Sequence, residues 1–425
     1  MFRSYWQDTA PAFDGSATGD PEQSPYDVVV IGGGFTGLSA ARHLAAQGVK
    51  TVVLESSRIG RGASGRNGGH LNNGLAHSFT AAVRHLGKER AAMLYHAFDR
   101  SIDMIETIIS QEKIDCDFRR AGKLKMAEKP AHFDALRHNF DALRQDVDPD
   151  IELLSAQDMK NDIGSDAFHG GLLWKKSAMM HMGKYAVGLA MAATRHGAAI
   201  FEHCPVTQRH TKNGLHHLTT PRGTFVARHV LLATGAYTTG PFGYFRRRII
   251  PVGSYIVATR PLDTNEVAKY LPGNRTYVTS KNIGNYFRLS PDNRLIFGGR
   301  ARFSAASNPH EDEKSSHILR ARIAEIFPGL ADIGIDYCWG GLVDMTRDRF
   351  PRAGFANNVW FAMGYSGHGA QISTLMGMAM ADAIMGRPDH NPVAGLKWSA
   401  IPGYFGKPWF LPIIGAYYRY RDLVS

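Results

Sequence analysis

A buried strand that runs directly into a glycine-rich turn is the feature that most constrains the fold of this chain. Residues 26–37 read YDVVVIGGGFTG, with a run of apolar residues before the glycines. The G-x-G-x-x-G spacing after a strand is typical of a turn that holds a pyrophosphate. Gly32 permits the tight turn, Gly34 lets the backbone approach the phosphates, and Gly37 lets the next helix pack closely. The segment therefore predicts a dinucleotide-binding fold.

The residues that follow complete such a unit. A helix is expected over 38–47, and the strand at 51–54 leads into Glu55. An acid about twenty residues beyond the glycines is the usual partner of a ribose. Phe35 and Thr36 lie between the glycines and the expected helix, whose N-terminus favours a negative phosphate. An incidental glycine turn in a βαβ unit is the alternative, and Glu55 favours the nucleotide site.

Further motifs favour a flavin over a nicotinamide. The chain carries SSRIGRGASGRNGGH at 56–70, LLATGAY at 231–237 and GYSGHG at 364–369. With GGGFTGLSAARHL, these motifs resemble the D-amino-acid oxidase type of FAD-dependent oxidoreductases over nearly the whole chain. Within that family, SGRNGG, YCWGGLVD and the tail YYRYRD are most similar to the gamma-glutamylputrescine oxidase group. A second G-x-G-x-x-G is absent, so the electrons are expected to come from the substrate and not from a separately bound NAD(P)H.

The resemblance implies FAD contacts in each of these motifs and at Leu71 and Val206 outside them. It also implies that FAD is held without a covalent bond, because Cys338 falls a few residues before the position where relatives attach flavin. The expected FAD contacts beyond Gly32, Gly34, Phe35, Thr36, Gly37 and Glu55 are Ser56, Arg58, Gly62, Ala63, Ser64, Arg66, Asn67, Gly68, Gly69, His70, Leu71, Val206, Ala233, Thr234, Gly235, Gly364, Tyr365, Gly367, His368 and Gly369.

The order of expected elements predicts an α/β fold. A Rossmann-like, doubly wound FAD-binding domain is combined with a discontinuous α+β substrate domain built on an antiparallel sheet. Both the pattern and the resemblance favour interleaved domains. The expected boundaries are an N-terminal arm at 1–25, an FAD-binding domain at 26–90, 150–245 and 331–390, a substrate-binding domain at 91–149 and 246–330, and a C-terminal tail at 391–425.

Composition narrows the class of protein. The chain has 425 residues, 44% of them hydrophobic, and a net charge of +11 spread along its length. No apolar run reaches the roughly 18 residues of a membrane span, and the first residues do not resemble a signal peptide, so a cytoplasmic location is expected.

No nucleic-acid-binding motif accompanies the positive net charge. Three scattered cysteines predict neither disulfides nor a metal site, and the basic run at 246–248 predicts a solvated loop.

The tail from 398 to 420 is interrupted by prolines and glycines, which argues against a membrane helix. Packing across the nucleotide domain is the first interpretation. Docking at a membrane or at a quinone-linked partner is the second.

The expected chemistry centres on the turn at 367–369. A reduced flavin carries negative charge, which the N-terminus of the helix expected over 371–385 can stabilise. His368 is either a contact of the flavin or a support of its loop. Arg288 aligns with a lysine that lies over the flavin in sarcosine oxidase relatives, and the alternative is a structural pair with Asp292 or with another acid at a strand end.

Aromatic residues are expected to enclose a neutral amine near the flavin. Each of them alone is more often a core residue. The candidates are Tyr255, Tyr286, Trp339 and Tyr365.

The resemblance is also informative where residues are missing. Glycine and D-amino-acid oxidases grip the substrate α-carboxylate with an arginine where this chain has Val343, and a further arginine of glycine oxidase aligns with Gly367. A carboxylate buried without such a partner is costly, so an amine without an α-carboxylate at the reacting carbon is expected. The leading substrate is gamma-glutamylputrescine, with oxygen as acceptor and peroxide as product. The alternatives are an amino-acid, opine or pipecolate dehydrogenase that reduces a quinone, and a non-catalytic FAD-binding subunit.

Overall fold

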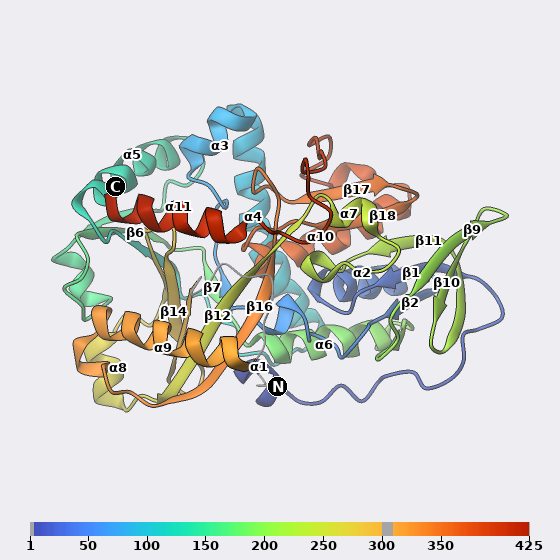
Figure 1. The fold of residues 1–425 in the computed structure, drawn as a ribbon, viewed down its shortest axis with the longest axis horizontal. Coiled ribbons are helices and arrows are strands. Elements are labelled where there is room, and N and C mark those ends of the chain that lie inside the picture. Colours follow the sequence, from blue (N-terminus) through green and yellow to red (C-terminus); the bar gives the residue numbers. More distant parts are fainter. Residues whose placement is uncertain (1–3, 300–308, 425) are drawn as a thin grey trace.

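Two sheets organise the molecule (Figure 1), described for residues 4–299 and 309–424 in a computed structural model. The first sheet runs in the order β17 (Arg352–Ala356), β18 (Val359–Met363), β11 (Gly223–Leu232), β1 (Tyr26–Ile31), β2 (Thr51–Leu54) and β8 (Ala199–Phe201). The second runs in the order β16 (Ile335–Met345), β12 (Ile250–Pro261), β15 (Arg294–Gly299), β14 (Asn285–Leu289), β13 (Thr276–Thr279), β4 (Lys123–Met126), β6 (Gly170–Trp174) and β5 (Glu152–Ser155).

The first sheet contains the predicted βαβ unit. β1 pairs in parallel with β2 and with β11, and β11 pairs in parallel with β18. α2 (Phe35–Ala46) starts directly after the glycine turn. Gly32 has a φ of 111°, and a Cβ on Gly37 would lie 2.0 Å from the Gly32 carbonyl oxygen. Both glycines are therefore required by the backbone, as the motif predicts.

Helices cover one face of the first sheet. α2 packs against α6 (Met182–Arg195) and α10 (Gly369–Ile384), and α10 also packs against α4 (Lys88–Glu112). On the other face, Val29 and Ile31 share a core with Phe225 and Phe361. β9 (Gln208–Lys212) and β10 (Leu215–Thr220) extend β11 as an antiparallel meander. The meander was not predicted, because β9 is a polar strand with little burial.

The second sheet is mainly antiparallel, and only the β13–β4 pair among those described is parallel. α9 (Pro309–Ile326) packs on one face, where Leu319 and Ile323 join Tyr255 and Phe297 in a second hydrophobic core. The predicted fold class, a Rossmann-like unit combined with a mostly antiparallel sheet, is confirmed.

The structure corrects part of the expected division into domains. β5 and β6, within 150–245, and β16, within 331–390, were assigned to the FAD-binding domain, yet all three pair in the second sheet. A short apolar strand carries no local signal for the sheet that it joins, because the partner is set by contacts far away in sequence. β16 therefore brings the motif YCWGGLVD to the second sheet, opposite the glycine turn of the first.

The N-terminal residues 4–8, which belong to the arm expected at 1–25, pack into the fold. α1 (Tyr5–Asp8) buries Trp6 completely. The Trp6 indole N–H donates to the Asn67 carbonyl at 2.7 Å, and the Ser4 hydroxyl donates to the Gly65 carbonyl at 2.7 Å. α1 thus supports the SGRNGG segment from behind.

The tail starts on the first sheet, as predicted. Trp398 stacks on Phe361 with ring centroids 5.0 Å apart. The basic run at 246–248 is not simply a solvated loop: α7 (Gly243–Arg246) covers its start, and the Arg248 guanidinium lies 3.6 Å from the centre of the Tyr244 ring and donates to the Trp398 carbonyl.

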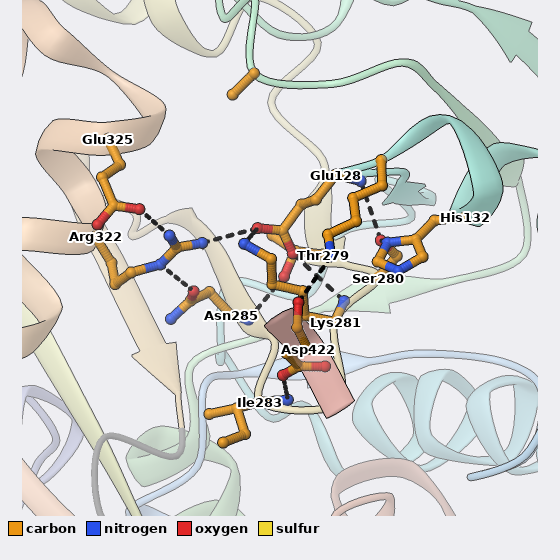
Figure 2. A network of polar contacts seen from close by, with 12 residues as sticks. Glu128, His132, Thr279, Ser280, Lys281, Ile283, Asn285, Arg322, Glu325 and Asp422 are labelled. Atoms are coloured by element: carbon orange, nitrogen blue, oxygen red, sulfur yellow. Dashed lines mark hydrogen bonds and ion pairs between the residues drawn. The ribbon is translucent and has the colours of Figure 1, made fainter. Parts of the chain in front are cut away.

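The tail then crosses to the second sheet as α11 (Leu411–Val424), which the prediction did not include. Figure 2 shows Asp422 of α11 beside the loop between β13 and β14, where it accepts N–H groups of Asn282 at 2.9 Å and Ile283 at 2.8 Å. The same loop is held by Lys281, which pairs with Glu128 at 3.2 Å. None of the helices in the described ranges combines the length and the apolar character needed to cross a bilayer.

Candidate functional site

A cavity of about 1540 Å³ is lined by residues of both sheets. This volume exceeds the 300–1,000 Å³ that is typical of a site for one small ligand. One end reaches the glycine turn after β1, and the other reaches β4, α5 (Pro130–Asp146) and α11. The space is therefore sufficient for an extended cofactor together with a substrate.

At one end of the cavity, Glu55 meets the glycine turn. Its carboxylate accepts the N–H of Gly33 at 2.7 Å and the N–H of Ser57 at 2.8 Å. Burial raises the pKa of Glu55, while these two hydrogen bonds act in the opposite direction. The Ser64 hydroxyl accepts the N–H of Phe35 at 3.0 Å, which ties the second glycine-rich segment to the start of α2. This arrangement fits the ribose and pyrophosphate of a dinucleotide.

Most residues expected to contact FAD line this cavity. The lining residues among them are Gly32, Gly34, Phe35, Thr36, Glu55, Ser56, Gly62, Ala63, Ser64, Arg66, Asn67, Gly68, His70, Val206, Ala233, Thr234, Gly235, Tyr365, Gly367, His368 and Gly369. The others do not line the cavity, and they are Gly37, Arg58, Gly69, Leu71 and Gly364.

The GYSGHG turn forms the wall near the middle of the cavity. α10 begins at Gly369, and the preceding His368 makes no side-chain cap, so the first N–H groups of the helix are left for another acceptor. Burial, together with the charges of Arg349 and Lys123, lowers the pKa of His368 to about 3. The imidazole is therefore neutral. The Tyr365 hydroxyl lies 2.7 Å from the Thr36 hydroxyl, which joins this turn to the start of α2.

Arg288 does not line the cavity, so its expected contact with the flavin is wrong. Its side chain is buried behind the SGRNGG segment, where it donates to the carbonyls of Gly68 at 3.2 Å and Met180 at 2.8 Å. The guanidinium carbon lies 4.9 Å from the Trp6 ring centre. The alternative pairing with Asp292 is also wrong, because Asp292 pairs with Arg294 at 2.8 Å. Burial lowers the pKa of Arg288 to about 9.

Two of the expected aromatic residues face away from the cavity. Tyr255 packs in the core of the second sheet, and Trp339 donates its indole N–H to the Arg66 carbonyl at 3.1 Å. Side chains alternate between the faces of a strand, so the neighbouring Ser254 and Gly340 line the cavity instead. Tyr286 and Tyr365 do line it, together with aromatic residues that were not predicted, such as Trp174 and Tyr237.

The two positions that lack the α-carboxylate arginines lie side by side. Val343 and Gly367 both line the cavity, and the Val343 methyl lies 3.9 Å from the position of a Cβ on Gly367. The strand at Val343 and the turn at Gly367 therefore come together without an arginine at either position. Arg347 and Arg349, which follow β16, line the cavity at other points and were not predicted.

Asp344 is a further residue that the sequence did not single out. It is buried at the end of β16 and accepts the N–H of Gly364 at 2.6 Å. Burial raises the pKa of its carboxyl to about 6, against the effect of hydrogen bonds from the backbone of Gly364 and Tyr365. Asp344 therefore fixes the GYSGHG turn. Its position next to Val343 in YCWGGLVD was the available signal.

The second set of missed residues is cationic. Lys123 and Lys125 of β4 line the same cavity as Arg349. Their signal in the sequence was the pattern KLKM, in which polar and apolar residues alternate as they do in a strand with one polar face.

Comparisons with known proteins agree with this geometry. The family model described as "FAD dependent oxidoreductase" (DAO) matches residues 27–383. The chain is 34% identical over 407 residues to the "Probable oxidoreductase OrdL" of Haemophilus influenzae, covering 93% of this chain and 92% of that protein. It is 32% identical over 403 residues to the "Gamma-glutamylputrescine oxidoreductase" of Escherichia coli K12, with the same coverage. The structure of glycine oxidase from Geobacillus kaustophilus superimposes with a TM-score of 0.73 at 22% identity, covering 89% of this chain and 100% of that chain.

Proposed function

Because this chain belongs to the DAO family of FAD-dependent oxidoreductases, we propose that it oxidises the C–N bond of an amine, with gamma-glutamylputrescine as the leading substrate. FAD is its cofactor, and when bound it supplies the acceptor for a hydride from the carbon next to the amine nitrogen. The imine product is then hydrolysed, and oxygen is the proposed final acceptor, giving hydrogen peroxide. The 32% identity to the oxidoreductase from E. coli supports this substrate.

The observation that carries the proposal is the pair of Val343 and Gly367. These adjacent positions offer no guanidinium to a carboxylate on the reacting carbon. An amine whose carboxylate is remote from that carbon suits such a wall, since a buried carboxylate needs a charged partner close by.

The residues around the GYSGHG turn suit a site that accumulates negative charge. The open N-terminus of α10 directs its partial positive charge into the cavity. Asp344 holds the turn through Gly364, and the neutral His368 can donate or accept a hydrogen bond without carrying charge. These groups are fixed before a substrate arrives, so no reorganisation is needed.

The cavity also favours the neutral form of the amine. An ammonium that leaves water for this cavity loses its hydration, and this burial lowers its pKa. The amine can therefore lose its proton on binding without a strong general base.

Anaerobic bleaching of the yellow protein tests the proposal. The panel contains gamma-glutamylputrescine, putrescine, sarcosine, pipecolate and D-amino acids, and absorbance near the visible flavin bands is followed. We expect rapid bleaching by gamma-glutamylputrescine. Bleaching only by α-amino acids would contradict the argument from Val343 and Gly367. Peroxide formation after admission of air then tests oxygen as the acceptor.

One observation favours a second candidate. Arg347 and Arg349 line the cavity, and a guanidinium can grip an α-carboxylate in a bidentate way. An amino-acid, opine or pipecolate dehydrogenase that reduces a quinone would use them so. It would turn over α-amino acids with a quinone analogue and form no peroxide in air. A non-catalytic FAD-binding subunit would not be bleached by any amine.

A further inference from the structure

β4 carries two lysines on the side of the second sheet that faces the cavity. Lys123 and Lys125 alternate along the strand with Leu124 and Met126. The two apolar side chains are fully buried in the core beneath the sheet, whereas both lysines line the cavity. Because side chains two apart on a strand share a face, the two ammonium groups are directed into the same space.

Lys123 has protein partners that fix its position. Its ammonium donates to the Asn73 carbonyl at 2.7 Å and lies 3.7 Å from the Trp174 ring centre. Burial and the charge of Lys125 together lower the pKa of Lys123 to about 7. The nearest acids, Asp99 and Asp148, are shared with Lys176, at 3.2 Å and 3.5 Å.

Lys125 lacks such partners. Within residues 4–299 and 309–424, no hydrogen bond or ion pair of its ammonium is found, although burial and the charge of Arg349 lower its pKa. Arg349 reaches the same cavity from the segment after β16, and its charge also acts on His368. Three cations therefore gather beside the GYSGHG turn.

Cations grouped in a partly dry cavity destabilise the folded chain unless an anion joins them. The acids that act on Lys123 are already paired with Lys176, and the ammonium of Lys125 has no acidic partner in the part of the chain that the structure describes, so a ligand can supply the anion. A carboxylate is the anion that the proposed substrate carries. Two ammonium groups and a guanidinium match its oxygens, since hydrogen bonds between charged partners are the stronger ones.

We propose that Lys125, together with Lys123 and Arg349, binds the remote carboxylate of the substrate. The inference rests on the proposed function in assuming an amine substrate, and it adds the residues that select for a carboxylate. In gamma-glutamylputrescine that carboxylate lies on the glutamyl α-carbon, at the opposite end from the amine of the putrescine part. The cationic group would therefore set the orientation of the substrate and reject amines that lack the acid.

Direct binding to the FAD-loaded protein tests the subsite without turnover. Calorimetry compares glutarate with glutaramide, which has the same length but no charge. We expect the K125M variant to bind glutarate at least about tenfold more weakly than wild type, because a charge-assisted contact is lost. K125R should retain most of the affinity. Equal glutarate affinity in wild type and K125M would overturn the proposal, as would equal binding of the two probes.

The matched control is K175M. Lys175 pairs with Glu152 at 2.5 Å on the outside of the second sheet, so its loss changes the net charge equally without touching the cavity. FAD content and melting temperature are measured for every variant. Should K125M fail to fold, K123M serves as the second variant with the same expected loss of glutarate binding.

Steady-state kinetics separate this inference from the proposed function. K125M should raise KM for gamma-glutamylputrescine at least about tenfold, with little change in kcat and no change in KM for putrescine. If the wild-type protein oxidises gamma-glutamylputrescine and K125M matches it, only the carboxylate subsite is wrong. If gamma-glutamylputrescine is not oxidised but another carboxylated amine is, and Lys125 controls its KM, the subsite stands and the proposed substrate is wrong.

Discussion

Glu55 couples the nucleotide end of the cavity to the glycine turn through the N–H groups of Gly33 and Ser57. We expect Glu55→Ala to weaken FAD binding by about 1.5–3 kcal/mol, the range for hydrogen bonds to a charged group. The measurement is the ratio of FAD to protein after gel filtration. Glu22→Ala, at an exposed residue outside the cavity, is the control. If the Glu55→Ala variant retains FAD fully, the Glu55 carboxylate does not contribute to FAD binding.

Lys123 gives the site a dependence on pH. Its pKa is lowered to about 7, so the ammonium is present below that pH and is lost above it. KM for a carboxylated amine should therefore rise as the pH increases through about 7, as one cation leaves the subsite. Lys123→Arg should flatten this rise, because arginine stays protonated. KM measured from pH 6 to pH 9 provides the check, and a profile that is the same in both proteins contradicts this assignment.

At the residue scale, the sequence predicted contacts that depend on local spacing. The glycines and Glu55 lie within one βαβ unit, so their relative positions follow from the motif. Lys125 and Arg288 could not be placed in this way. Which face of a strand meets the cavity depends on how the two sheets pack, and the packing put Lys125 inside and Arg288 behind the wall.

At the scale of elements, the contact between α2 and β1 depends on Gly37. A Cβ there would lie 2.0 Å from the Gly32 carbonyl oxygen, so the helix must move away from the strand. We expect Gly37→Val to lose bound FAD and to melt at a lower temperature. Gly19→Ala is the control, since a Cβ at that residue meets no atom within 4 Å. A Gly37→Val protein with normal FAD content would show that the close approach is not needed.

α11 forms part of the cavity wall through Leu411, Ile414 and Tyr418, and Asp422 anchors it to the β13–β14 loop. Asp422→Ala removes the acceptor of the backbone N–H groups of Asn282 and Ile283, so the link between α11 and the loop is weakened. We expect faster proteolysis within 401–424 and stronger quenching of flavin fluorescence by iodide. Asp389→Ala, at an exposed residue outside the cavity, should change neither. Unchanged quenching in the Asp422 variant would mean that α11 does not shield the cofactor.

Helices could be predicted from local signals in the sequence. The sheet that each strand joins could be predicted less well. The helices α2 and α10 lie close to their expected ranges of 38–47 and 371–385, because the signals for their starts and ends are local in the sequence. β5, β6 and β16 were assigned to the wrong sheet, since pairing partners far apart in sequence leave no local trace.

At the scale of the whole molecule, bound FAD should contact both sheets and stabilise their packing, because both contribute to the cavity wall. Removing FAD should lower the melting temperature, and adding it back at a hundredfold excess over Kd should restore about 2.7 kcal/mol. Scanning fluorimetry of the stripped and the reconstituted protein measures the shift. Identical melting curves would indicate that the sheets hold together without the cofactor.

The contact between the Thr36 and Tyr365 hydroxyls joins residues 329 positions apart in the chain. Ribosomes add ~5–20 residues per second, so roughly 15–70 seconds separate the emergence of the two halves of the site. The glycine turn can form early and recognise the adenosine end, while the wall for the ring system is still being made. Cofactor loading is therefore expected to finish only after translation has passed the GYSGHG segment, and a ribosome stalled before it would carry a chain unable to retain FAD.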